Sequence, residues 1–507
     1  MEPAAGKQGS LRNVLVRLLL FGVFLMLLRF AYVIAIAGES CNVGAFCFFS
    51  TSDSESVSVL VSGSGHGAFS ARAASSDYTF RSSAWPELYK SNEWSEGVQF
   101  YSSVFQDLIA EGYITPESKS LCVETSTGSD VFALKENGIM DSIGISKKAG
   151  EARRFPLGDN MFDFVFSGQG GLDKSARPLE FASEIARTLK PKGFVVFHVK
   201  ANDTYSFNSF MDLFNCCMVV KSRDIDGFDS SMPYIREIVL RKEGDGIIGH
   251  ETEKQNSERN CSALGYKQEL VAKAEPLIAE EPLKPWITLK RNIKNIKYLT
   301  SMVDISFKNR YVYVDVGARS YGSSIGSWFR KQYPKQNKTF HVYAIEADKT
   351  FHQEYGLKKG ITLLPYAAWV KNGTLTFEIH RDPGKQAETT VRGMGRIQPL
   401  HFAGEFDGEV EKIQGFDFAE WLKNTVSNND FVVMKMDVEG VEFDLIPRLF
   451  ETGAICLVDE IFLECHYNRW QRCCPGQRSS KYEKTYEQCL ALFYSLRRRG
   501  VLVHQWW

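Results

Sequence analysis

The sequence has almost no net charge and few cysteines for its length. Its 507 residues include 60 lysine and arginine residues against 61 aspartate and glutamate residues, which leaves a net charge of -1. A chain without a charge surplus has no global field that attracts nucleic acid, so we expect no nucleic-acid partner. Its 11 cysteines are too few for a disulfide scaffold, and the odd number leaves at least one thiol unpaired in a monomer.

Two common metal-binding patterns are also missing. No two cysteines have the C-x-x-C spacing of structural zinc sites. There is no convincing D-x-D on a predicted loop, which makes a glycosyltransferase-like role the weakest hypothesis. Cysteines near the predicted turn 473–476 favour disulfides instead. They are Cys456, Cys465, Cys473, Cys474 and Cys489.

Long hydrophobic runs are almost absent, and the exception lies near the amino terminus. It extends from Leu18 to Ala37, which is about the length that crosses a bilayer as a helix, and only Arg29 interrupts it. Basic residues precede the run and Glu39 follows it, so the positive-inside rule predicts a cytosolic tail at 1–17, a signal-anchor and a lumenal body. The alternative is a cleaved signal peptide.

Both hypotheses predict the secretory pathway, and we expect a single-pass membrane glycoprotein of the Golgi apparatus. The N-x-[ST] pattern of glycosylation acceptors fits this expectation. It occurs at Asn202, Asn260, Asn337 and Asn372.

Composition divides the remaining chain into a stem, two folded units and a linker. Residues 38–93 are rich in Ser and Gly and lack periodicity, which is typical of a flexible stem. Residues 94–242 alternate strand and helix patterns, which predicts a mainly parallel sheet. The charged, aperiodic stretch 243–285 is the predicted linker. Residues 286–507 form the second unit, which opens with a predicted basic helix at 286–302.

The first unit resembles the class I S-adenosylmethionine-dependent methyltransferases over two segments, 155–163 and 184–194. The resemblance implies a Rossmann-like fold. The cofactor pattern differs, because residues 124–129 read E-T-S-T-G-S where the family has a Gly-rich loop. Ser146 stands where the family has an acid for the ribose hydroxyls. We therefore predict a degenerate, non-catalytic methyltransferase-like domain, whose role is packing, orientation or the binding of a protein partner.

Acidic residues mark the ends of three apolar, strand-like runs in the second unit. Asp315 and Gly317 come at the end of the first, Glu346 follows the second and Asp437 follows the third. The carboxyl ends of parallel strands are where an open α/β sheet binds its ligand. The pattern therefore predicts a site for a nucleoside-type cofactor.

Each of these residues suits one part of such a cofactor. Gly317, followed by Ala318, lets the backbone turn closely under a ligand. Asp315 could hold the amino-acid part. Glu346 offers two acceptor oxygens for vicinal ribose hydroxyls.

Four further residues are candidates for catalysis, namely Asp437, Glu439, Glu464 and His466. Methyl transfer from a sulfonium to a hydroxyl needs a group that removes the acceptor proton, and the ordinary pKa of histidine, near 6.5, suits His466 to this role. A divalent metal held by the three carboxylates is an alternative, weaker hypothesis. The simpler interpretations are that Asp437 caps a helix and that His466 is an ordinary core histidine.

The motifs of the second unit, in this order and spacing, resemble the FkbM-like S-adenosylmethionine-dependent methyltransferases. The matching pieces are 315–318, 343–348, 366–369 with 373–375, 435–442 and 464–466. The resemblance implies S-adenosyl-L-methionine as the cofactor. Arg319 and Tyr321 depart from the family, which usually has a small polar residue and a glycine there.

The sequence thus predicts an α/β protein with two Rossmann-like class I methyltransferase folds in tandem after an N-terminal transmembrane helix. The expected function is that of a membrane-anchored lumenal O-methyltransferase that uses S-adenosyl-L-methionine and acts on a glycan or other hydroxylated small-molecule acceptor. The alternative is a catalytically inactive methyltransferase-like scaffold protein of the secretory pathway.

Overall fold

The computed structural model describes the parts of the chain that form the two predicted folded units. The described residues are 58–60, 91–146, 154–168, 170–243, 265–380, 394–397, 409–471 and 476–506. The predicted cytosolic tail and the predicted anchor at 18–37 lie outside them.

The prediction of a single-pass membrane protein is corrected. Across the described ranges, no helix combines the length and the apolar character that a membrane crossing requires. The longest helix in those ranges, α3 (Asn92–Ala110), buries one face and exposes polar residues on the other. Such a helix packs on a protein core and does not span a bilayer.

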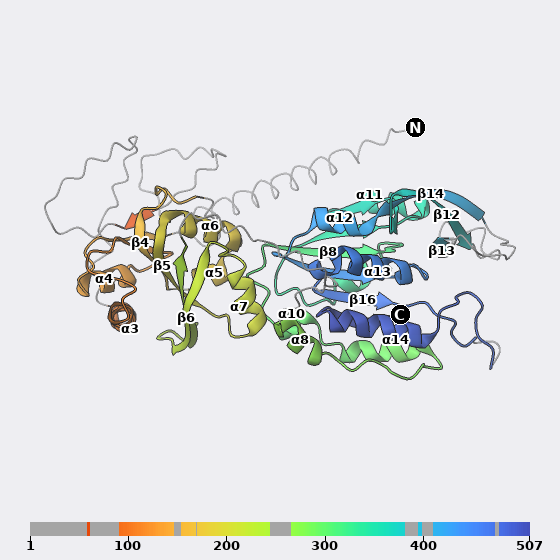
Figure 1. Ribbon diagram of the computed structural model, residues 1–507, viewed down its shortest axis with the longest axis horizontal. Coiled ribbons are helices and arrows are strands. Elements are labelled where there is room, and N and C mark those ends of the chain that lie inside the picture. The colour runs from red at the N-terminus through yellow and green to blue at the C-terminus, as the bar shows by residue number, and fades with distance from the viewer. Residues whose placement is uncertain are drawn as a thin grey trace, which may run out of the picture. The chain divides into compact units, whose positions relative to one another are not determined.

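The first sheet forms from residues of the predicted stem and the first unit (Figure 1). Its strand order within the described residues is β1-β3-β2-β4-β5-β7-β6. The strands are β1 (Ser58–Leu60), β2 (Ser120–Val123), β3 (Ser142–Ser146), β4 (Phe162–Ser167), β5 (Leu189–Val199), β6 (Cys217–Asp226) and β7 (Tyr234–Lys242). The four strands β3, β2, β4 and β5 run parallel, and β6 and β7 form an antiparallel hairpin. The predicted mainly parallel sheet is confirmed.

Helices of the first unit pack on this sheet through apolar faces. Besides α3, they are α4 (Ser129–Glu136), α5 (Gly171–Lys174), α6 (Pro178–Thr188) and α7 (Thr204–Met211). Pro178 opens α6, where its missing N–H leaves no hydrogen bond unmade. Phe181 and Ile185 recur at helical spacing and are buried against the sheet, so α6 is held mainly by packing.

The second sheet consists of parallel strands. Its order among the described residues is β10-β9-β8-β15-β16-β17, and every neighbouring pair is parallel. The strands are β8 (Arg310–Val316), β9 (Phe340–Ile345), β10 (Ile361–Leu364), β15 (Asp430–Met436), β16 (Glu460–Glu464) and β17 (Leu502–Trp506). This is the doubly wound arrangement that the sequence predicts for the second unit. That it is a methyltransferase fold remains a prediction.

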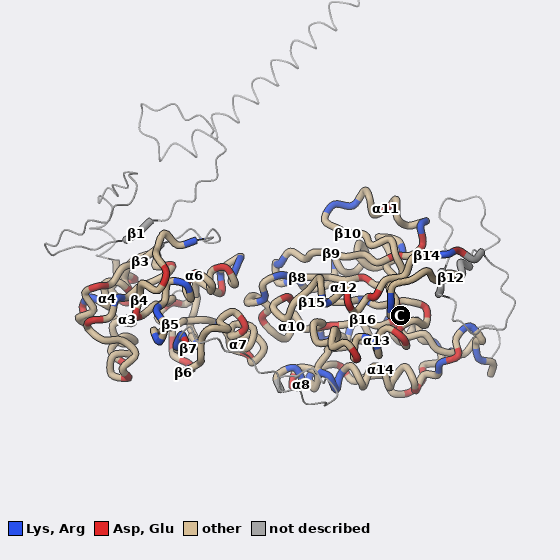
Figure 2. The backbone as a smooth tube through the Cα atoms, turned by 45° about the horizontal axis from the view of Figure 1, so that its top comes forward, with Lys and Arg blue, Asp and Glu red and all other residues tan. Residues whose placement is uncertain are grey.

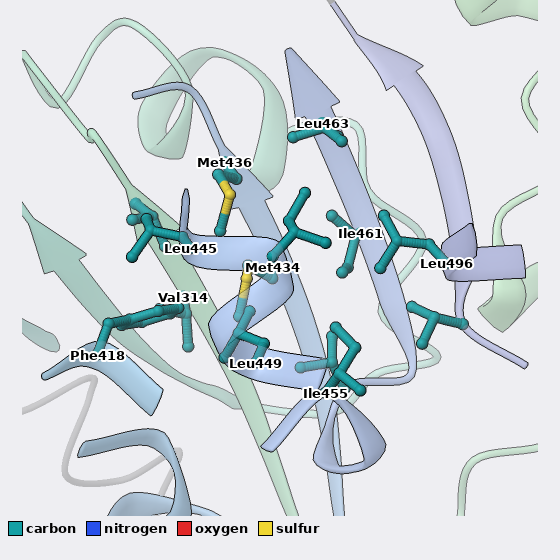
Figure 3. Packing of buried hydrophobic residues seen from close by; sticks show 14 of the residues in the cluster. Val314, Phe418, Met434, Met436, Leu445, Leu449, Ile455, Ile461, Leu463 and Leu496 are labelled. Atoms are coloured by element: carbon teal, nitrogen blue, oxygen red, sulfur yellow. The ribbon is translucent and has the colours of Figure 1, made fainter. Parts of the chain in front are cut away.

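Side chains of this sheet alternate between two cores. Met434 and Met436 of β15 lie beside Leu445 and Leu449 of α13 on one face (Figure 3). Because successive residues of a strand point to opposite faces, Val433 between the two methionines packs in the other core. The first core is covered by α12 (Phe418–Thr425), α13 (Glu442–Thr452) and α14 (Tyr486–Arg498). The second is covered by α8 (Gly265–Ala272), α10 (Leu299–Met302), η2 (Ile325–Phe329) and α11 (His352–Gly356).

A third, smaller sheet was not predicted. Its order in the described part of the chain is β11-β14-β12-β13. The strands are β11 (Ala367–Trp369), β12 (Gly373–His380), β13 (Met394–Ile397) and β14 (Glu409–Asp417). It arises between β10 and α12 in the chain, and it brings aromatic side chains to the site described below.

Three other sequence-based boundaries differ from the structure. The predicted helix at 286–302 is divided into α9 (Pro285–Asn292), η1 (Ile293–Asn295) and α10. The predicted linker contains α8, and the predicted stem contains β1. β1 and α8 each pack against a folded unit, which periodicity over such short segments does not reveal.

A disulfide joins the end of β16 to α14. It links Cys465 to Cys489, and Cys456 is disulfide-bonded as well. The predicted disulfides in this region are confirmed for these cysteines. The Cys465–Cys489 bond fixes the strand end that carries Glu464 and His466 to a neighbouring helix.

Charged residues of both signs are interspersed along the described chain (Figure 2). This distribution agrees with the near-zero net charge. Some charged residues are buried, and three of these, Asp315, Glu346 and Asp348, lie at or just after the carboxyl ends of strands of the second sheet.

Candidate functional site

A cleft lies at the carboxyl ends of β8, β9 and β15. It encloses a cavity of about 110 Å³. Its walls are formed by Gly317, Arg319, Glu346, Asp348, Phe351, Tyr366, Ala367, Phe377, Asp437 and Glu439, among others. In the sheet, β8 lies between β9, which comes next in the chain, and β15, which comes much later. The order of the strands therefore reverses at β8, and the cleft opens at this point. Doubly wound sheets bind their ligands at this point.

Gly317 brings the loops after β8 and β15 into contact. Its φ is +76°, and a Cβ at this position would lie 1.9 Å from the carbonyl oxygen of Asp437. Only glycine fits both the backbone conformation and the space. The close approach that the sequence predicts is therefore made to the neighbouring loop, and it forms the floor of the cleft.

Replacing Gly317 with alanine should lower the free energy of unfolding by about 2–5 kcal/mol, because it adds backbone strain and a steric clash. Gly373 is a matched control, since a Cβ there meets nothing within 4 Å. Urea denaturation of the two alanine variants measures the difference. Equal stability of Gly317→Ala and Gly373→Ala would show that the two loops do not meet as described.

Glu346 lies at the end of β9 with its carboxylate in the cleft wall. One oxygen accepts a hydrogen bond from the backbone N–H of Arg319 at 2.6 Å, and the other accepts one from Asp348 at 2.7 Å. Each oxygen keeps a second lone pair, so the carboxylate is held in place and can still accept from a ligand. Burial raises the pKa of Glu346 to about 7, although the two N–H groups oppose the shift.

The two positions that depart from the FkbM-like pattern have a structural explanation. Arg319 adopts φ +54°, in the left-handed region that glycine enters most easily, and it still donates its N–H to Glu346. The ring of Tyr321 packs over Gly326, where a Cβ would lie 2.4 Å from a ring carbon. The loop thus reaches Glu346 without the family's glycine.

Asp315 and Ala318 lie beneath the cleft, and neither is among the residues that form its wall. Asp315 is fully buried and accepts hydrogen bonds from Tyr313 and Ser324. Its other oxygen lies 3.8 Å from the Nζ atom of Lys435. Burial raises the pKa of Asp315, and Lys435 opposes the shift. These contacts favour a supporting role for Asp315 below the loop over direct contact with a ligand.

The four predicted catalytic residues do come together, around the ring of His466. The Nδ1 atom lies 3.2 Å from Glu442, which also accepts the backbone N–H of His466 at 2.6 Å. The Nε2 atom faces Asp437 at 3.6 Å, Glu464 at 3.8 Å and Glu439 at 3.9 Å.

This environment changes the expected protonation of His466. Burial lowers its pKa, but the surrounding carboxylates, with Glu442 first, overcome this effect and raise the pKa to about 10. A ring that carries a proton at neutral pH cannot remove another one. The geometry therefore favours an electrostatic role for His466 over the predicted role of base.

The carboxylates around the ring differ in their other contacts. Glu439 accepts hydrogen bonds from Tyr482 and, at 2.7 Å, from Lys481. Burial opposes ionisation of Glu439, but the nearby cations, His466 first, lower its pKa to about 2. No described residue donates a hydrogen bond to the carboxylate of Glu464, and burial followed by repulsion from Asp437 raises its pKa to about 7.

Sequence reasoning missed several residues of the site. Phe351, Tyr366 and Phe377 form apolar parts of the wall, Lys435 pairs with Asp437, and Glu442 holds His466. A signal existed for Lys435, because a lysine within the apolar run 430–436 needs a buried partner. Tyr366 and Phe377 had no such signal, since their positions depend on the third sheet.

The equivalent crevice of the first sheet contains a glutamate side chain. Glu124 follows β2, and a Cβ on Gly171, which opens α5 after β4, would lie 1.5 Å from a carboxylate oxygen of Glu124. Asp130 is buried beside this loop and accepts a hydrogen bond from Thr125 at 2.5 Å. Burial raises the pKa of Asp130 to about 6. The loop after β2 is therefore packed by its own polar side chains.

Two family models match separate parts of the chain. Residues 111–197 match a model described as a methyltransferase domain. Residues 271–374 and 399–507 match a domain of unknown function, DUF7870. The second match covers the unit for which the sequence suggests an FkbM-like methyltransferase, so that finer assignment remains a proposal. No curated protein matches the chain.

Solved structures of methyltransferases resemble part of the chain. A SAM-dependent methyltransferase from Aquifex aeolicus is 14% identical over 32% of this chain and 100% of its own, with a TM-score of 0.22. The Burkholderia thailandensis 1,6-didemethyltoxoflavin-N1-methyltransferase, with S-adenosylhomocysteine bound, is 13% identical over 32% of this chain and 85% of its own, with a TM-score of 0.24. A chain from a Haloferax volcanii complex of the Trm112 methyltransferase activator with a methyltransferase is 13% identical over 33% of this chain and 100% of its own, with a TM-score of 0.24. TM-scores this low carry no argument about function.

The family-model match at 111–197 carries the assignment that these comparisons allow. It supports S-adenosyl-L-methionine-dependent methyltransferase activity, with S-adenosyl-L-methionine as the cofactor.

Proposed function

We propose that this protein is an S-adenosyl-L-methionine-dependent O-methyltransferase whose second unit, of FkbM-like type, binds the cofactor and carries out the transfer. The cofactor lies in the cleft at the ends of β8, β9 and β15. The acceptor is a hydroxyl group of a small molecule or glycan, presented at the Asp437 side.

The observation that carries this proposal is the position of Glu346. Its carboxylate is held by two backbone N–H groups in the wall of a cleft at the switch point of a parallel sheet. An acid at the end of the second strand of such a sheet is suited to accept hydrogen bonds from both hydroxyls of a ribose. The aromatic side chains of Phe351 and Tyr366 in the same wall offer an apolar surface to a base.

The acceptor side lies next to this cofactor position. Asp437 forms part of the cleft wall, and its side chain is 29% exposed, so an incoming hydroxyl can reach it. A carboxylate at this place can accept the hydroxyl proton as the oxygen attacks the methyl group. The Nζ atom of Lys435 lies 3.3 Å from one carboxylate oxygen of Asp437, and the Nε2 atom of His466 lies 3.6 Å from the other. Both stabilise the negative charge of Asp437.

We further propose that the first unit is a degenerate methyltransferase-like domain that does not hold the cofactor and serves to bind a protein partner. Glu124 packs against the backbone at Gly171, where the crevice between β2 and β4 would receive a ligand. A like charge in that crevice disfavours the carboxylate of the cofactor's methionine part.

Photo-crosslinking tests which unit holds the cofactor. The full-length protein is irradiated with methyl-labelled S-adenosyl-L-methionine, digested, and the labelled peptides are identified by mass spectrometry. The proposal predicts label within residues 311–380, which include Glu346 and the aromatic wall of the cleft. Label confined to 120–200, or no label at millimolar cofactor, would contradict it.

Cofactor affinity should depend on pH through Glu346. The pKa of this residue is about 7 in the free protein, and only the ionised carboxylate accepts hydrogen bonds from both ribose hydroxyls. Affinity for S-adenosyl-L-homocysteine should therefore be highest above pH 7 and fall up to about tenfold per pH unit below it. Calorimetric titration from pH 5.5 to 8.5 measures this.

Glu346→Gln is the control for this titration. Glutamine does not ionise, so any pH dependence that remains in the variant comes from the ligand itself or from other residues. An identical pH profile in the variant and the natural protein would exclude Glu346 as the group responsible.

A further inference from the structure

We propose that Asp437, Glu439, Glu464 and His466 form a binding site for one divalent cation. The cation lies at the acceptor side of the cleft, where it would bind the acceptor hydroxyl. That catalytic role rests on the proposed function, whereas the binding of the cation itself does not.

The ring of His466 is fixed in the orientation of a metal ligand. Its side chain is 8% exposed, and its Nδ1 atom lies 3.2 Å from the buried carboxylate of Glu442. The backbone N–H of His466 donates to the same carboxylate, which holds that carboxylate in place beside the ring. When Nδ1 donates its proton to Glu442, the lone pair of Nε2 points away from Glu442. Metal-binding histidines commonly have a carboxylate partner of this kind on the second nitrogen.

The space in front of Nε2 matches an ion in size. The atom faces one oxygen each of Asp437, Glu464 and Glu439, at 3.6, 3.8 and 3.9 Å. These separations are too long for hydrogen bonds. Two ligand atoms that each lie about 2.1 Å from one metal ion are about 3–4 Å apart. The ligand atoms of Asp437, Glu439 and His466 all lie within 4.8 Å of one another, so small side-chain movements complete the shell.

The carboxylates around the ring outnumber the ammonium groups, so the negative charge there favours a cation. The carboxylates of Asp437, Glu439, Glu442 and Glu464 surround His466, and the ammonium groups nearby belong to Lys435 and Lys481. Lys435 is shared with Asp315 below the cleft. A divalent cation would compensate for this negative charge.

The ligand set selects the class of cation. One imidazole nitrogen with carboxylate oxygens suits Mn²⁺ or a similar first-row ion better than Ca²⁺ or Mg²⁺, which prefer oxygen alone. An ion at this place would lower the pKa of a bound hydroxyl and orient it. It would therefore act on the acceptor, while Glu346 binds the cofactor.

Electron paramagnetic resonance of Mn²⁺ tests the site without an assay of activity. Full-length protein is treated with EDTA, exchanged into metal-free buffer and titrated with MnCl₂. The proposal predicts one bound ion per chain. Asp437→Asn and His466→Gln should each weaken binding at least about tenfold, because each removes one ligand. Glu451→Gln is the matched control, since Glu451 is an exposed acid on α13, and it should bind as the natural protein does.

Three outcomes would overturn the proposal. They are no bound ion at millimolar Mn²⁺, unchanged binding in both ligand variants, and equal weakening in Glu451→Gln. Circular dichroism of each variant separates loss of a ligand from loss of folding. The result is also distinct from that for the cofactor. Cofactor binding without Mn²⁺ binding would contradict only the proposed cation site. Mn²⁺ binding without cofactor binding would contradict only the proposed function.

Discussion

Replacing Glu442 with alanine should lower the free energy of unfolding by about 3–5 kcal/mol, which is the cost of removing one partner from a buried charged pair. Glu442 has no exposed surface. Its carboxylate accepts hydrogen bonds from the backbone N–H groups of Gly440 and His466 and lies 3.2 Å from the His466 ring. Alanine leaves all three donors without a partner in the protein interior.

Urea denaturation measures this loss, with Glu451→Ala as the control. Glu451 lies on the same helix, α13, with 68% of its side chain exposed, so its replacement should change stability by less than about 0.5 kcal/mol. A similar small change for Glu442→Ala would mean that Glu442 does not hold His466 in place.

Replacing Glu346 with alanine should weaken binding of S-adenosyl-L-methionine about 100-fold. Hydrogen bonds to a charged acceptor contribute about 1.5–3 kcal/mol each, and two such bonds to the ribose hydroxyls account for this loss even if part is recovered by water. The effect should appear in the dissociation rate more than in the association rate, because the entrance to the cleft is unchanged.

Isothermal titration of the natural protein and the variant measures the loss. Glu420→Gln provides the control, because Glu420 is an exposed acid of α12 with 59% of its side chain exposed. Unchanged affinity in Glu346→Ala, with normal folding, would place the ribose of the cofactor elsewhere.

The ends of the central strands could be predicted from the sequence. An apolar run that stops at an acid, as at Asp315, Glu346 and Asp437, is local information, and the sheet order confirms that all three belong to neighbouring strands. Parallel strands bring such ends to one edge, so the meeting of Gly317 with Asp437 followed from topology. The gathering of Glu439, Glu464 and His466 followed for the same reason.

Other parts of the site depend on contacts that no local pattern encodes. In the third sheet β14 pairs with β11 and with β12, which precede it in the chain, and these pairings place Tyr366, next to β11, and Phe377 of β12 in the cleft wall. The protonation of His466 depends on Glu442, whose burial at the start of α13 could not be read from periodicity. An isolated histidine would have its ordinary pKa near 6.5, which is why the sequence favoured a base.

The membrane prediction rested on one hydrophobic run that lies outside the described residues. Among the helices that the structure does describe, none is suited to cross a bilayer. The predicted anchor at 18–37 contributes no residue to the site, because the site residues lie within 315–482.

The stoichiometry of cofactor binding tests the central claim most directly. Isothermal titration of the full-length protein with S-adenosyl-L-methionine should give one site per chain, which Glu346→Ala weakens about 100-fold and Glu124→Gln, in the crevice of the first sheet, leaves unchanged. Two sites per chain, or a single site whose affinity Glu346→Ala leaves unchanged, would contradict the assignment of the cofactor to the second unit.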